Sequence, residues 1–135
     1  MNTGKSTQEI YKNCDMANML NSVEPYLETA KGKFGYALAR NVRKLRDACL
    51  EFLQLQQNLI AQLGEEEKDE AGNSTGNFSI KIGTPACEEY LKQIGEYVDI
   101  EHSVEIYKVP YDLLPDSLTA KDLLALDWML YDADE

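Results

Sequence analysis

Few residues of this chain have the types and spacing that catalysis or metal binding requires. His102 is the only histidine, so a histidine-rich metal site cannot form, and its neighbours favour a surface position. The three cysteines, Cys14, Cys49 and Cys87, are dispersed and form no CxxC pair. Neither a zinc ribbon nor a redox dithiol is therefore indicated. We expect no catalytic residue, no metal site and no cofactor, and thus a protein that is not an enzyme.

Two short motifs lack the residues that their chemistry needs. TGKST, residues 3–7, resembles the end of a phosphate-binding P-loop, but the glycine four residues earlier and the preceding buried strand are missing from this sequence. EEEKDEAGN, residues 65–73, lacks the aspartate ladder and terminal glutamate of an EF-hand loop. The sequence supports neither nucleotide binding nor calcium binding.

Acidic residues dominate the chain and are unevenly distributed. The net charge of −11 divides into +2 over residues 1–64, −3 over residues 65–83 and −10 over residues 84–135. Because phosphate binding needs an excess of lysine and arginine, we expect no direct contact with nucleic acid. A basic protein surface is the partner that such charge favours, and the alternative is that the acids only keep the surface hydrated.

The acidic C-terminal third contains the residues that we predict to contact a partner. Aspartates recur there every four to six residues, and tyrosines add contact area at low entropic cost. The predicted partner-binding residues are Asp112, Asp116, Asp122, Asp127, Asp132, Tyr107 and Tyr111.

The elements that position these residues indicate an α+β fold, dominated by helices, in a single domain of residues 1–135. A capping pattern predicts a helix over 6–21, and apolar spacings of four and three predict a long helix over about 25–63. Its heptad seam comprises Leu38, Val42, Leu45, Cys49, Phe52, Gln56, Leu59 and Leu63. A bend or break is expected near KGKFG, residues 31–35, because each glycine weakens a helix.

The seam has two interpretations. It can pair with a second copy to form a homodimer, because a polar residue such as Gln56 at a seam position often sets the register. The self-association residues are then Leu38, Val42, Leu45, Phe52, Gln56 and Leu59. The seam can instead pack on the terminal helix within one chain, which we favour.

Six cations between residues 31 and 47 fall away from this seam. They are Lys31, Lys33, Arg40, Arg43, Lys44 and Arg46. Their heptad positions predict a hydrated helix face, and the alternative is a docking surface for the acidic half of the chain or for an acidic partner.

The second half of the chain predicts shorter elements. Residues 64–77 read as an acidic, glycine-rich mobile loop or hairpin tip, and FSIKI, residues 78–82, as a strand. Thr84 and Pro85 begin a helix, and residues 103–109 alternate as a second strand, which gives a short two-stranded sheet. Thr119 and Asp122 cap a C-terminal helix, and the tail 131–135 is expected to fray.

The N-terminus lacks an apolar region of the signal-peptide type, and no apolar run approaches the roughly 20 residues of a membrane span. The dispersed thiols suit a reducing compartment. We therefore expect a cytoplasmic protein without membrane contact.

Three segments together resemble a family of small, uncharacterised phage proteins from Gram-positive hosts. They are ALARNVRKLRDACLEFLQLQQNLIAQLGEEEKDEAGN, VEIYKVPYDLL and LTAKDLLALDWML, within about residues 20–130. The residues that carry the resemblance are Ala39, Asn41, Leu45, Leu63, Gly64, Glu65, Val104, Ile106, Leu118, Thr119, Leu126 and Met129. The resemblance implies a phage or prophage origin, expression in the host cytoplasm and a non-catalytic role.

Two functions are compatible with these observations. The first is a stoichiometric inhibitor of a host nucleic-acid-processing defence enzyme, of an anti-CRISPR-like or DNA-mimic-like kind, that presents carboxylates where phosphates would lie. The alternative is a role in virion assembly, or as a tail or head accessory protein, through the heptad seam.

Overall fold

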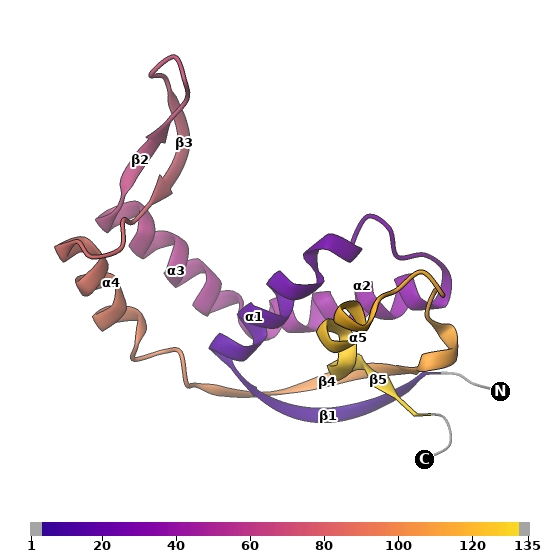
Figure 1. The fold of residues 1–135 in the computed structure, drawn as a ribbon. Coiled ribbons are helices and arrows are strands. Elements are labelled where there is room, and N and C mark those ends of the chain that lie inside the picture. Colours follow the sequence, from indigo (N-terminus) through magenta and orange to yellow (C-terminus); the bar gives the residue numbers. More distant parts are fainter. Residues whose placement is uncertain (1–3, 133–135) are drawn as a thin grey trace. The chain divides into compact units, whose positions relative to one another are not determined.

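The computed structural model describes residues 4–132 and has the expected α+β fold, with helices and two small sheets (Figure 1). The chain divides into two compact units. Unit 1 combines the residues up to 49 with those from 101 onward, and unit 2 comprises residues 50–100. The single-domain organisation of the chain stays a prediction. None of the helices within residues 4–132 combines the length and apolar character of a membrane span.

Unit 1 is built on a three-stranded sheet of order β1-β4-β5. Strand β1 (Lys5–Lys12) pairs antiparallel with β4 (Glu101–Pro110) through eight consecutive residues, and β5 (Leu130–Tyr131) pairs parallel with the end of β4. The expected strand over 103–109 is confirmed as the central part of β4.

The expected helix over 6–21 is wrong in its first half, which forms β1. Side chains there alternate between partly covered and exposed, which is the period of a strand, and β4 supplies the pairing partner. The helix α1 (Asn13–Val23) begins later, where the Asp15 carboxylate accepts a hydrogen bond from the Lys12 N–H at 3.3 Å. The helix therefore begins seven residues later than expected.

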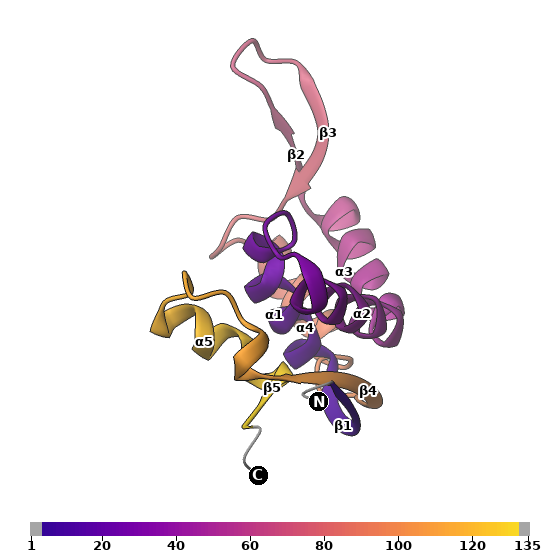
Figure 2. The same ribbon diagram turned by 90° about the vertical axis from the view of Figure 1, so that its right-hand side faces the viewer.

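Helices α1, α2 (Gly32–Ala48) and α5 (Ala120–Leu126) lie on the same side of the β1–β4 ladder (Figure 1 and Figure 2). Short 3₁₀ helices occur at Glu24–Tyr26, Tyr111–Leu113 and Asp127–Met129. The apolar core of unit 1 comprises Met16, Val23, Phe34, Ala37, Leu38, Val42, Leu45, Cys49, Val104, Ile106, Val109, Leu126, Met129 and Leu130.

The long helix expected over 25–63 is in fact two helices. Helix α2 begins at Gly32, whose φ of +64° suits glycine, so the break expected near KGKFG is confirmed. It ends at Ala48, and α3 (Leu50–Leu63) follows Cys49, whose φ of −110° and ψ of 19° are not helical. No glycine or proline marks this second break, and the apolar spacing continues across it, so periodicity alone joined the two helices.

On α2, the seam residues are buried and most of the six cations are exposed. Leu38, Val42 and Leu45 are buried within unit 1, but α2 packs mainly on β4 and α1, so the expectation that the seam packs on the terminal helix is wrong. Most of the six cations, Arg43 among them, are exposed, as a hydrated face requires. Arg40 differs, because its guanidinium pairs with the Glu105 carboxylate at 2.9 Å, and this pairing raises the pKa of the arginine.

One buried amide of α2 completes the sheet. Asn41 is fully buried, its Oδ1 accepts the N–H of Tyr107 at 2.7 Å, and its Nδ2 donates to the C=O of Tyr107 at 2.9 Å. The side chain thus takes the place of a neighbouring strand on the edge of β4 opposite β1. Helix α2 and β4 are held in register by these two bonds.

Unit 2 contains α3, a two-stranded sheet and α4 (Pro85–Ile94). Strands β2 (Glu65–Lys68) and β3 (Ser74–Ser79) form a hairpin that projects beyond the two helices (Figure 1). At its tip, the Asp69 carboxylate accepts the N–H groups of Ala71 and Asn73, so the hairpin alternative for residues 64–77 describes this segment. The strand expected over 78–82 starts earlier and ends at Ser79, and it lies in a different sheet from residues 103–109.

Both predicted helix caps of the second half are confirmed. Thr84 accepts the N–H of Cys87 at 3.2 Å, and Thr119 and Asp122 form a reciprocal capping box. The terminal helix is shorter than expected, because it ends at Leu126 and the chain continues through a 3₁₀ turn into β5. Of the tail expected to fray, Tyr131 pairs in β5, and residues 133–135 lie outside the described residues.

We expect Asn41→Leu to lower the free energy of unfolding of unit 1 by about 3 kcal/mol. The leucine fills a similar volume, but it leaves the partly buried N–H and C=O of Tyr107 without partners, at a cost of roughly 1–3 kcal/mol per group. Urea denaturation followed by circular dichroism measures the change. Asn18→Leu, at an exposed position of α1, is the matched control, and equal stability of the two variants would show that the amide is dispensable.

Candidate binding surfaces

The predicted aspartates have different environments in unit 1. Asp122 caps α5, where it accepts the N–H of Thr119 at 2.9 Å, and it also accepts the hydroxyl of Tyr26. The hydrogen bond from Tyr26 is the main cause that lowers the pKa of Asp122, and the same bond raises the pKa of Tyr26. This carboxylate therefore links α5 to the turn after α1.

Three predicted residues meet at one groove beside β5. Tyr111, Asp127 and Asp132 line a groove of about 540 Å³, together with Lys5, Thr7, Tyr11, Lys108, Trp128, Leu130 and Tyr131. The Tyr111 hydroxyl donates to the Asp127 carboxylate at 3.2 Å. Asp112 and Asp116 are exposed and do not line this groove.

The groove already pairs its charges internally. The Lys5 ammonium lies 4.3 Å from the centre of the Tyr131 ring, and Lys108 forms an ion pair with Glu9 at 3.1 Å. Lys108 is the main cause that lowers the pKa of Glu9. The lining includes Lys5 and Lys108 as well as Asp127 and Asp132, so its field favours neither a strongly acidic nor a strongly basic ligand.

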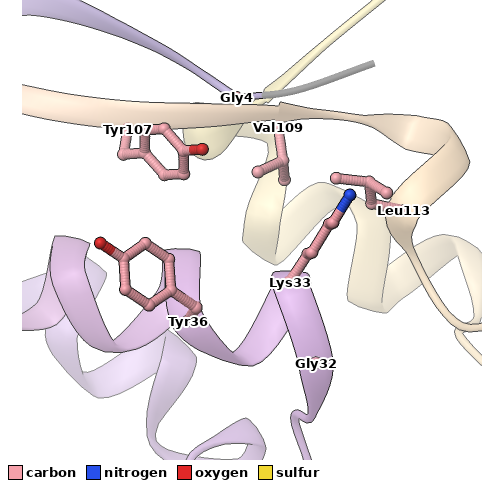
Figure 3. A pocket seen from close by; sticks show the side chains of 7 residues that line it. All are labelled: Gly4, Gly32, Lys33, Tyr36, Tyr107, Val109 and Leu113. Carbon is pink, nitrogen blue, oxygen red and sulfur yellow. The ribbon is translucent and has the colours of Figure 1, made fainter. Parts of the chain in front are cut away.

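Tyr107 lies in a second cleft of unit 1, of about 250 Å³, between β4 and the first turns of α2 (Figure 3). Its ring meets Tyr36 edge-on, with ring centres 6.1 Å apart, and the Arg40 guanidinium lies 5.1 Å from its centre. A side chain at Gly4 would overlap the Tyr107 ring, so the backbone passes directly over that ring. The tyrosine is thus an element of packing as well as part of an open cleft.

Unit 2 has a surface that the sequence analysis missed. An apolar groove of about 370 Å³ lies between β3 and α4, and three of its side chains are unusually exposed: Ile82 at 95%, Leu91 at 59% and Phe78 at 41%. The groove is lined by Ile60, Phe78, Ser79, Ile80, Ile82, Cys87, Tyr90 and Leu91. The available signal was FSIKI, residues 78–82, which we assigned entirely to a strand.

Two glutamates lie beside residues of this apolar groove. Glu66 is the cross-strand partner of Phe78, so the two side chains share one face of the hairpin. Glu88 lies three residues before Leu91 on α4, which makes the two side chains neighbours on the helix surface. Residues 50–100 contain ten acids and three cations, a net charge of −7, whereas the rest of the chain carries −4. Of the two units, unit 2 is therefore the more acidic.

No group of three metal-ligating side chains occurs within residues 4–132. Comparisons with protein-family models, with curated proteins and with solved structures found no match. The phage family named above stays a prediction.

We expect the stabilising effect of Asp122 to depend on pH. Its pKa in the folded protein lies below the ordinary value of 3.8, so its stabilisation is present above that value and is lost as the pH falls through the folded pKa. Wild type should therefore melt at a higher temperature than Asp122→Asn at neutral pH, and the gap should close as the pH is lowered below 3.8. Thermal unfolding of both proteins, from neutral pH to below 3.8, measures the difference in melting temperature.

The control for this experiment is Asp116→Asn, at an exposed position of the same region. That variant should follow wild type at every pH. A gap for Asp122→Asn that stays constant down to the lowest pH would contradict the proposed role of its charge.

Proposed function

We propose that this chain is a non-enzymatic protein that binds a basic protein partner through unit 2. The observation that carries the proposal is the exposed apolar groove between β3 and α4, with Ile82 and Leu91 at its surface and glutamates beside it. Exposed apolar groups gathered in a groove are a common feature of interaction sites, because their burial by a partner is favourable.

The chemistry of the surface indicates the chemistry of the partner. An apolar strip removes apolar side chains of the partner from water, and the glutamates beside it attract lysine and arginine. A segment with one apolar face and a basic remainder satisfies both conditions, as in the binding of an amphipathic helix to a groove.

Within this proposal, the specific role that we favour is stoichiometric inhibition of a nucleic-acid-processing enzyme. Such enzymes present basic surfaces to phosphate, and a bound domain with a net charge of −7 occupies them with carboxylates. The assembly alternative depends on the heptad seam, and burial of Leu38, Val42 and Leu45 inside unit 1 gives it no support.

The proposal is tested with a labelled amphipathic helical peptide built from leucine and lysine. We expect wild type to bind it, and Ile82→Asp to weaken binding by at least about tenfold, or ~1.4 kcal/mol, because a carboxylate replaces an apolar contact. Fluorescence anisotropy measures the dissociation constants. Raising the salt concentration should weaken binding, because the rim contacts are exposed charges.

Two matched controls accompany this measurement. Leu124→Asp changes an exposed leucine of α5 in unit 1 and should bind the peptide as wild type does. A leucine and glutamate peptide of the same pattern should not bind. Equal loss of affinity in both aspartate variants, or equal binding of both peptides, would refute a site in unit 2.

A further inference from the structure

Strand β1 is the outer strand of the sheet in unit 1. It pairs with β4 along one edge through eight residues without a bulge, and within residues 4–132 no strand pairs with its other edge. A strand edge of this length is a template for pairing with another chain.

The contacts of Asn41 identify the backbone groups on that outer edge. Asn41 binds both the N–H and the C=O of Tyr107, and the two groups of a strand residue point to the same edge. The N–H and C=O of Tyr107 therefore point away from β1, and those of its cross-strand partner Ser6 point away from β4. Because this direction alternates along a strand, the N–H and C=O groups of Gln8 and Ile10 also point away from β4. All three residues are exposed, so three N–H and three C=O groups face solvent.

The charges of β1 select a register with a second copy of itself. If Thr7 faces Thr7 of the other copy in an antiparallel pair, Lys5 of each copy faces Glu9 of the other, and Glu9 also keeps its ion pair with Lys108 of its own chain. A register centred on Glu9 sets two carboxylates against each other, and one centred on Gln8 forms no charge pair. Opposite charges directly across a pair stabilise it, and like charges destabilise it.

The same register gives the exposed Ile10 a contact. Its side chain is 67% exposed, and it would lie opposite Gly4 of the other copy. The Tyr107 ring occupies the space beside Gly4, and both residues line the cleft of Figure 3. Ile10 of each copy would therefore meet a tyrosine ring of the other, and an aromatic ring over a strand glycine is a favourable cross-strand arrangement.

We propose that β1 is a self-association edge, through which two copies join their sheets about a two-fold axis with Thr7 at the centre. The contact is isologous, so it closes at a dimer. Backbone bonds of Ser6 and Gln8 supply its affinity, and the Lys5–Glu9 pairs set its register. The surface is separate from the groove of unit 2 and does not depend on the function proposed above.

The first experiment uses proline to block the edge. Gln8→Pro removes an N–H that points away from β4, so the ladder within the chain keeps its bonds. By sedimentation velocity we expect wild type to dimerise reversibly in the micromolar range, and Gln8→Pro to dimerise at least about tenfold more weakly. Gln8→Ala, which also loses the bond from Ser103 but keeps the N–H, should dimerise as wild type does.

A second experiment tests the register independently of folding effects. Cys14 and Cys87, which are partly exposed, are first replaced by serine. Under mild oxidation, Thr7→Cys should then form a covalent dimer in high yield, because directly opposed residues lie close enough for a disulfide. Ser6→Cys should not form this dimer, because residue 6 of each copy faces Gln8 of the other copy and the two cysteines are not directly opposed. A monomeric wild type, a dimer that persists in Gln8→Pro, or equal cross-linking of the two cysteine variants would overturn the proposal.

Discussion

The two hydrogen bonds between Asn41 and the backbone of Tyr107 are the interaction on which unit 1 most depends. Strand β4 lies at the centre of the sheet, but β5 pairs only with its last two residues. Before that point, the partly buried N–H and C=O of Tyr107 on this edge would lack partners, and unpaired polar groups are costly away from water. One amide on α2 satisfies them, and in doing so it fixes where the helix lies along the strand.

Several other contacts of unit 1 are arranged around the same point. One residue before Asn41, Arg40 reaches Glu105 and the Tyr107 ring, and Tyr36 meets the same ring one turn earlier. The two hydrogen bonds of Asn41 thus bring α2 close enough to β4 for the Arg40–Glu105 ion pair and the Tyr36–Tyr107 ring contact. Because contacts in one network are coupled, their separate energies cannot be added.

The sequence predicted the elements whose signals are local. The break at KGKFG, the caps at Thr84 and Thr119, and the alternating strand around residues 103–109 are short-range patterns, and all are present. The first strand was misassigned because a capping pattern at Ser6 competed with its alternation, and only β4, about 95 residues further along the chain, decides between them. Asn41 could not be recognised for the same reason, because its partner is 66 residues away.

The acidic residues show a related limit. Net charge located acids in the C-terminal third, but charge counts do not separate an aspartate that caps a helix, such as Asp122, from one that only faces water. The groove in unit 2 was missed because residues 78–82 were all assigned to a strand. Whether Ile82 is covered depends on where Ser79 ends the strand, and a sequence pattern fixes element boundaries poorly.

The strand edges of the two units carry different charges, and this difference distinguishes the kind of partner that each proposed surface can bind. Strand β2 carries three consecutive glutamates, so a second copy or an acidic strand is repelled from its edge, and what unit 2 presents for binding is its side chains. Strand β1 alternates lysine, glutamate and lysine among neutral residues, a pattern that complements itself when the strand is reversed. Repulsion therefore directs unit 2 toward basic partners, while β1 retains an edge that its own sequence can pair.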